Sequence, residues 1–293
     1  MKVRFGVGVG AGAEPARFAQ VVDRLEAAGV DSLWLPELVY SHTVDPTVGM
    51  AFALSRTTRL KVGTSVSILP GRHPVLVAKQ LASLAALAPK RVLPVFGLRP
   101  ARPAEYDLFP APEGRRAALF DESLRLLRTA VDSDELDFAG EFFTVAANGL
   151  GPRPARPLDL WLGGSAPAAL RRVGRLADGW LGSFLTPQEA GRARETIQAA
   201  AAEANREIEP DHFGISLFLA QDGIPPEFAA GARARRPGVD PADLIADGWP
   251  DLHRKLDGYL AAGLTKFVIG TTDTRPYNEF IDRFVAEVIP RQN

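Results

Sequence analysis

A glycine-rich turn at residues 163–167 has the composition of a phosphate-binding site. The segment Gly163-Gly164-Ser165-Ala166-Pro167 follows an apolar run and opens a predicted helix. Two glycines let backbone N–H groups approach an anion closely, and the start of a helix carries partial positive charge. Ser165 can add a hydroxyl donor. A tight strand-to-helix turn without a ligand also favours glycine, so composition alone gives the two interpretations equal weight.

Polar side chains also follow two earlier apolar runs. Thr64, Ser65 and Ser67 lie in the segment 63–70, at the expected end of a strand. Serine and threonine are ordinary at strand ends, so this pattern is weak by itself. Glu37 follows the previous strand, and its carboxylate could bind a ligand or accept a proton. The alternative for Glu37 is a salt bridge at the rim of the sheet.

The histidines and the absence of cysteine exclude several kinds of chemistry. The four histidines are far apart and lack metal-ligand spacing, so we expect no metal site. His42 lies in an expected loop and could reach a substrate, whereas His73, His212 and His253 are interpreted as structural. Without cysteine there are no disulfides, thiolate ligands or cysteine nucleophiles. The sequence contains neither a P-loop nor a nucleophile elbow.

Length, composition and charge limit the class of protein to which the chain can belong. The chain has 293 residues, is 46% hydrophobic and carries a formal net charge of -1. This composition supports a sizeable core, and the missing basic stripe gives no reason to expect nucleic acid. No apolar stretch is long enough for a signal peptide or a membrane span. We therefore expect a cytoplasmic protein that binds neither nucleic acid nor membrane.

Short β-rich runs alternate with longer helical patterns along the whole chain. We expect eight strands, at residues 4–9, 32–35, 60–65, 92–96, 158–162, 179–181, 213–220 and 266–270. Such alternation implies a parallel sheet covered by helices. Eight units at this length favour a closed (β/α)₈ TIM barrel over an open doubly wound sheet. The sequence thus predicts an α/β fold with one barrel domain spanning residues 1–293.

Local signals place the helices and two insertions. A helix is expected at 14–28, another starts at Asp45-Pro46, and Thr186-Pro187-Gln188-Glu189 forms a capping box. One insertion follows strand four: a Pro-rich loop, then a helix and a small hairpin at 137–145. Residues 221–246 are rich in Pro, Arg and Asp, and we expect a loop containing one helical turn. Active sites of such barrels lie on loops after the strands, where the polar groups described above fall.

These motifs together resemble a known family. The sequence is similar to the bacterial luciferase-like monooxygenase superfamily, particularly its actinobacterial branch of coenzyme F420-dependent oxidoreductases. The resemblance runs from the first strand to the last helix. It is carried by the segments DSLWLPE (31–37), LKVGTSVSILPGRHPVLVAK (60–79), RVLPVFG (91–97), LWLGGSAPAALRRVGRLADGW (160–180) and KFV (266–268).

The resemblance implies a cofactor site at the barrel mouth. In this family the phosphate of FMN or F420 lies near the Gly-Gly turn, and a cis peptide often ends strand three; the matching bond here is Ser65–Val66. The family's acidic position after strand two matches Glu37. The resemblance therefore implies Glu37 and His42 as catalytic candidates. The cofactor-binding candidates are Thr64, Ser65, Val66, Gly97, Arg99, Gly163, Gly164 and Ser165.

Two departures from the family pattern limit the expected chemistry. F420-dependent sugar-phosphate dehydrogenases have a histidine after the acidic residue and a glutamate after Gly-x-Gly at strand four. Here the first position is Leu38, and the second, which follows Phe96-Gly97-Leu98-Arg99, is Pro100. The nearest replacements, His42, Tyr40 and Glu105, stand at none of the motif positions. Arg99 adds a fixed positive charge suited to an anionic cofactor or substrate.

The resemblance implies an oxidoreductase that transfers a hydride between coenzyme F420 and a small organic substrate, with the protein forming a homodimer. The first alternative is an FMN-dependent monooxygenase supplied by a separate reductase. The second is a catalytically silent flavin-binding barrel, which the missing acid/base pair favours. The loops at 97–113 and 221–246 are the expected pocket walls, and they carry no motif that names a substrate.

Overall fold

The chain forms a closed barrel of parallel strands. The computed structural model describes residues 2–10, 15–154, 156–272 and 277–293. Six strands are continuous: β1 (Arg4–Gly8), β2 (Ser32–Leu35), β9 (Trp161–Gly163), β10 (Gly179–Ser183), β11 (Phe213–Ala220) and β13 (Lys266–Thr271). Two strand runs are interrupted, so that β3 (Lys61–Thr64) continues as β4 (Ser67–Ile68), and β5 (Val92–Leu93) continues as β6 (Val95–Gly97).

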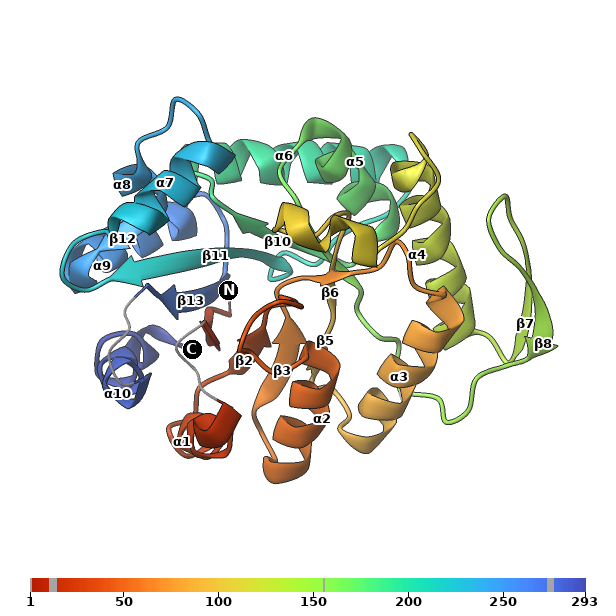
Figure 1. Ribbon diagram of the computed structural model, residues 1–293, viewed down its shortest axis with the longest axis horizontal. Helices are drawn as coiled ribbons and strands as arrows, with labels where there is room; N and C mark the ends of the chain where they lie inside the picture. Colours follow the sequence, from red (N-terminus) through yellow and green to blue (C-terminus); the bar gives the residue numbers. More distant parts are fainter. Residues whose placement is uncertain (1, 11–14, 155, 273–276) are drawn as a thin grey trace.

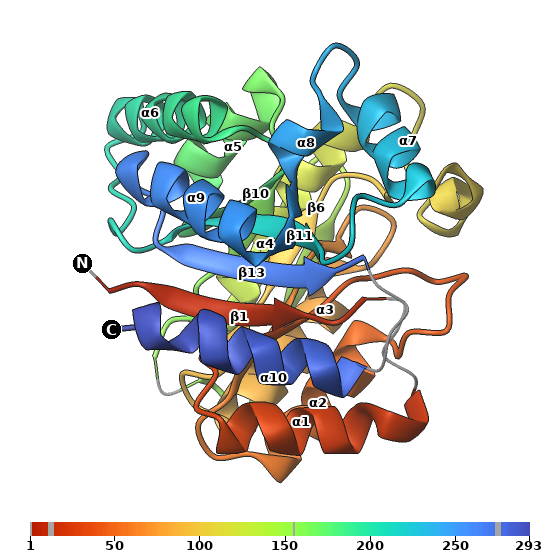
Figure 2. The ribbon, with the colours of Figure 1, turned by 90° about the vertical axis from the view of Figure 1, so that its left-hand side faces the viewer.

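The pairing of the interrupted runs closes the barrel. The strand order is β4-β6-β9-β10-β11-β13-β1-β2-β3-β5, so the path ends on the two runs with which it begins. Val62 pairs with Val92 below the interruptions, and Ser67 pairs with Phe96 above them. The first and last strands lie side by side, with Arg4 opposite Lys266 (Figure 2). The predicted (β/α)₈ barrel is confirmed.

Helices surround the strands, as Figure 1 shows. The main ones are α1 (Phe18–Ala27), α2 (Pro46–Arg56), α3 (Pro74–Leu87), α4 (Arg116–Asp132), α5 (Pro167–Leu176), α6 (Pro187–Glu203), α9 (Gly248–Ala261) and α10 (Tyr277–Glu287). The expected start of the first helix at Glu14 lies outside the described residues. The predicted caps are confirmed: Asp45 accepts from Val48 N at 3.0 Å, and Thr186 forms a capping box with Glu189. In the part of the chain that the structure describes, no helix is long and apolar enough to cross a membrane.

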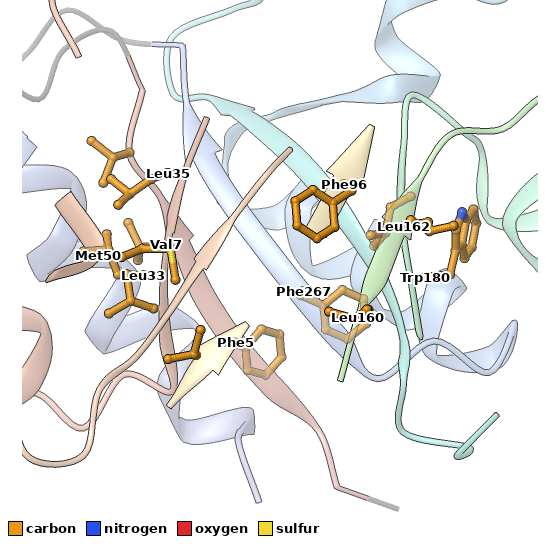
Figure 3. Packing of buried hydrophobic residues seen from close by; sticks show 14 of the residues in the cluster. Phe5, Val7, Leu33, Leu35, Met50, Phe96, Leu160, Leu162, Trp180 and Phe267 are labelled. Carbon is orange, nitrogen blue, oxygen red and sulfur yellow. The ribbon is translucent and has the colours of Figure 1, made fainter. Parts of the chain in front are cut away.

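Two apolar layers hold the barrel together. The outer layer lies between strands and helices; Phe5 and Phe267 stack there at 5.3 Å between ring centroids, and Met50 of α2 faces Leu33 (Figure 3). A separate inner cluster fills the barrel itself. Its buried members are Trp34, Val95, Trp161, Leu181 and Val268. Because strand side chains alternate between faces, one sequence pattern supplies both layers.

The insertions are more ordered than the sequence indicates. A short 3₁₀ helix (η2, Pro103–Leu108) follows β6, and the expected hairpin stands outside the barrel as β7 (Glu135–Ala139) and β8 (Thr144–Asn148). The expectation of a single helical turn at 221–246 was wrong. This segment contains α7 (Pro226–Arg235), α8 (Pro241–Leu244) and β12 (Ile245–Asp247). Its Ile224, Phe228 and Val239 pack on a small apolar cluster around Ala220, which stabilises the added elements.

Candidate active site

The interruption of the third strand meets two glycines of neighbouring strands. The Ser65–Val66 peptide is cis, as expected, and Ser65 N donates to Leu35 O at 2.9 Å. A Cβ added at Gly97 would lie only 2.6 Å from Val66 Cγ2, and one at Gly163 would lie 3.0 Å from Val66 Cγ1. The missing side chains therefore make room for Val66. Three of the expected cofactor-binding residues, Val66, Gly97 and Gly163, thus come together from strands far apart in the sequence.

Glycines mark the carboxyl ends of four strands around this point. They are Gly8, Gly97, Gly163 and Gly270. Below them, the inner cluster is built of large side chains, including Trp34 and Trp161. Glycine exposes backbone and allows a ligand to approach closely. The mouth of the barrel thus has bulky side chains beneath and little side chain around its rim, which suits a flat ring system.

The Gly-Gly turn leads into a helix without a side-chain cap. Gly164 has φ +107°, a conformation that favours glycine, and its carbonyl accepts from Trp180 Nε1 at 2.9 Å. Ala166 occupies the N-cap position of α5 and provides no cap hydrogen bond. Side chains cap α2, α3 and α6, whereas α1, α4, α7 and α9 are uncapped like α5, so it is the adjoining Gly-Gly turn that distinguishes α5. The first N–H groups of an α-helix need an acceptor. Exposed Ser165 lies beside them, so the turn can bind a phosphate.

Glu37 forms the rim salt bridge considered as its alternative role. The side chain is buried, and both of its oxygens are engaged by the guanidinium of Arg72, at 2.7 and 2.8 Å. Oε2 also accepts from Ile68 N at 2.7 Å. The carboxylate therefore fixes the backbone just after Val66 and holds Arg72 over the ring of Phe109. Glu37 therefore acts in this arrangement as a positioning group: its carboxylate is paired with Arg72 and fixes the rim of the mouth.

Two other polar candidates, Thr64 and His42, differ in burial. Thr64 is buried, and its hydroxyl donates to Val95 O and accepts from Val95 N, both at 2.8 Å. It therefore joins the third and fourth strands where they are interrupted. His42 is exposed on the loop after β2. The catalytic roles of His42 and Glu37 stay predictions; the structure places His42 on the exposed loop and Glu37 in a buried salt bridge.

Glu105, which the sequence indicated only as a nearby replacement for the missing acid/base pair, has a structural role. This residue of η2 is fully buried, and its Oε1 accepts from Tyr40 N at 3.2 Å, while Oε2 has no partner among the described residues. Arg102 donates to the carbonyl of the same Tyr40 at 2.9 Å. Together the two side chains clamp the loop after β2. An acidic residue in a Pro-rich loop gives no sequence signal of such burial, because the contact spans 65 positions.

Arginines gather around the segment after β6. The guanidinium of exposed Arg99 lies 5.0 Å from the ring centroid of Tyr106. Arg116, at the start of α4, donates to Phe109 O at 2.8 Å. Burial, together with the positive charge of Arg99, lowers the pKa of Arg116 from its ordinary value. The predicted positive charge at the mouth is therefore shared by two neighbouring side chains.

The fold and the site define a class of protein: a parallel (β/α)₈ barrel with a glycine-lined mouth and an uncapped helix start after the Gly-Gly turn. The model of the luciferase-like monooxygenase family matches residues 1–242. The chain therefore belongs to this family, and the resemblance drawn from its motifs is confirmed.

Curated relatives and a solved structure agree with this assignment. An uncharacterized protein of Mycobacterium tuberculosis is 34% identical over 203 residues, covering 62% of this chain and 70% of the relative. An F420-dependent glucose-6-phosphate dehydrogenase of Beutenbergia cavernae is 27% identical, covering 91% of this chain and 90% of the relative. An F420-dependent secondary alcohol dehydrogenase, solved with an F420-acetone adduct, superposes with a TM-score of 0.83 at 18% identity, with full coverage of both chains. At that identity the superposition shows the common fold.

Proposed function

We propose that this protein is an oxidoreductase that transfers a hydride between coenzyme F420 and a small organic substrate. The observation that carries the proposal is the uncapped start of α5 at the Gly163-Gly164 turn, directly beside Val66 and the glycine-lined rim. Phosphate and ring therefore have adjacent places at one barrel mouth. Relatives that use F420 support the same assignment.

The proposal gives each candidate residue a physical role. The backbone of Gly163 and Gly164 and the hydroxyl of Ser165 bind the phosphate. Ser65, Val66 and Gly97 support the ring, and Thr64 holds the two interrupted strands in register behind it. The cofactor supplies the hydride chemistry, while the protein orients the reactants and excludes water. His42 is the side chain available for proton exchange, and Glu37 fixes the rim.

FMN is the alternative cofactor. It also presents a phosphate and a flat ring system, so the cradle at α5 and the rim at Val66 would accept it. With FMN, a monooxygenase reaction fed by a separate reductase becomes the corresponding activity. A catalytically silent barrel is the alternative from another class, and it would bind the cofactor without turning over any substrate.

Cofactor titration separates these possibilities. Purified apo-protein is titrated with F420 and with FMN while the quenching of its tryptophan fluorescence is followed. The proposal expects saturable binding with F420 the tighter ligand; tighter binding of FMN supports the monooxygenase, and binding of neither rejects both. A screen of alcohols, aldehydes and enones with oxidised and reduced F420 then tests catalysis. Failure of every substrate class would favour the silent barrel.

We also infer that the protein forms a homodimer through α2 and α3. These helices follow neighbouring strands and expose four large apolar side chains: Val48 (66%), Phe52 (41%), Leu76 (67%) and Leu87 (83%). Exposed apolar side chains on adjoining helices are typical of association surfaces. Light scattering after gel filtration should give twice the chain mass of 31.5 kDa. The double variant Val48→Lys/Leu76→Lys should give the monomer mass, and a monomeric parent would contradict the inference.

A further inference from the structure

Two arginines at the barrel mouth lack an acidic partner. Among the described residues, no carboxylate pairs with Arg99 or Arg116. Arg116 Nη2 donates to Phe109 O at 2.8 Å, whereas its Nη1 is shielded from solvent and has no acceptor among the described residues. A buried N–H of a charged group without an acceptor is costly. The site is therefore incomplete as it stands.

Other arginines nearby do have a carboxylate partner. Arg72 is held bidentately by Glu37, and Arg115 pairs with Glu141 at 2.6 Å. Arg99 and Arg116 instead contact the same short segment: Arg99 lies over the ring of Tyr106, and Arg116 donates to Phe109 O, while Phe109 N donates to Tyr106 O at 3.3 Å. Burial, together with the positive charge of Arg99, lowers the pKa of Arg116. The missing element at this point is a negative charge.

The surroundings of the pair favour an anion as well. Arg116 is the first residue of α4, a helix of 17 residues that has no side-chain cap and no acidic residue in its first turn. The positive end of the helix thus adds to the two guanidiniums. Arg99 lies two positions after Gly97, the glycine that contacts Val66. Arg99 therefore follows closely on the strand end that forms part of the proposed ring site.

We propose that Arg99 and Arg116 bind an anionic group of the substrate, a carboxylate or a phosphate. This inference rests on the proposed function, and it narrows the substrate to organic anions. Guanidinium groups recognise both kinds of anion by paired N–H donors. The anion would accept from Arg116 Nη1 and from Arg99, whose guanidinium is already placed over Tyr106. The two arginines act on specificity and orientation, and no bond is made or broken at them.

Inorganic phosphate is the probe for this site. Because phosphate would also enter the Gly163-Gly164 cradle, its binding is measured by calorimetry in two backgrounds. One is the protein saturated with F420. The other is the Ala166→Asp variant, in which a carboxylate blocks the cradle. We expect millimolar binding in both, weakened at least about tenfold by Arg99→Gln and by Arg116→Gln, which corresponds to about 1.4 kcal/mol. Arg115→Gln is the matched control and should leave the phosphate Kd unchanged.

The same variants also show whether the bound anionic group belongs to the substrate or to the cofactor. Arg99→Gln is the decisive variant, because the side chain of Arg99 is exposed and lies over the ring of Tyr106 outside the core. An unchanged F420 Kd together with lost phosphate binding supports a substrate anion. An equal phosphate Kd in all variants overturns the proposal, and so does a tenfold loss of F420 affinity, which would assign the pair to the cofactor. Arg99-dependent phosphate binding in a protein that takes up no F420 supports the anion site while rejecting the proposed function.

Discussion

Substitution of Ala166 by aspartate should change stability and cofactor affinity in opposite directions. Ala166 is the N-cap residue of α5, with φ -65° and ψ 147°, and it offers no side chain to the free N–H groups. An aspartate there would cap the helix and stabilise the fold by about 0.5–2 kcal/mol. The same carboxylate would occupy the N–H groups and repel a phosphate.

The loss of affinity can be bounded from Coulomb's law. Two unit charges about 4 Å apart repel by about 1 kcal/mol in water and by about 4 kcal/mol at the effective dielectric near a protein surface. Because Ala166 is exposed, we take the lower half of this range. This is about 1–2.5 kcal/mol, so cofactor binding should weaken by about fivefold to seventyfold. Replacement of Gly164 would be less informative, because its φ of +107° would strain any other residue.

The assay compares three proteins by thermal unfolding and by F420 titration. Ala166→Asn is the control, because it can cap the helix without adding charge. Both variants should unfold at higher temperature than the parent, and only Ala166→Asp should lose affinity by the larger factor. An Ala166→Asp protein that is stabilised and still binds F420 as tightly as the parent would refute the phosphate cradle.

Four further predictions follow from the same geometry. Glu37→Gln breaks the bidentate pair with Arg72 and should lower the free energy of unfolding by about 1–3 kcal/mol in a denaturant titration; unchanged stability with lost activity would assign Glu37 a purely catalytic role. Gly97→Ala should weaken F420 binding at least about tenfold, because its Cβ would lie 2.6 Å from Val66 Cγ2, whereas Gly191→Ala, with 3.5 Å to its nearest atom, should not. The hydrogen bond from Arg236 lowers the pKa of Glu189 below its ordinary 4.5, so this pair stabilises the fold above pH 4.5 and is lost as the pH falls further; melting temperatures of Glu189→Gln should show a flatter acid limb, and an equally steep limb would contradict this. With F420 and glucose 6-phosphate, steady-state turnover should be about 10²–10⁴ times slower than that of a sugar-phosphate dehydrogenase with the complete acid/base pair, because Leu38 replaces the histidine of that pair. Robust turnover that His42→Ala abolishes would show that the base had moved.

The sequence predicted the features that depend on local pattern. Strand and helix alternation gave the barrel, and side-chain caps such as Asp45 were placed correctly because they act on N–H groups three residues away. The family motif located the cis bond at Ser65–Val66. Such features can be predicted because they depend on residues close together in the sequence or on a motif shared with the family.

Features that depend on tertiary contacts were not predictable. Glu37 and Arg72 are 35 positions apart, so nothing local indicates that one neutralises the other. The ten-residue α7 was missed because prolines and glycines flank it on both sides, although its own sequence, PEFAAGARAR, is rich in the helix formers Ala and Arg. It is stabilised by burial of Phe228 against Phe218, with ring centroids 5.9 Å apart. Likewise, the lack of a carboxylate partner for Arg116 among the described residues becomes visible only in the folded structure.

The position of the bound cofactor tests the central claim most directly. A crystal structure of the protein with F420 should place the phosphate at the N-terminus of α5, within hydrogen-bonding distance of the backbone of Gly164 and Ser165. The ring should rest against Val66, beside Gly97. A phosphate bound at any other helix, or a ring that does not touch Val66, would contradict the account.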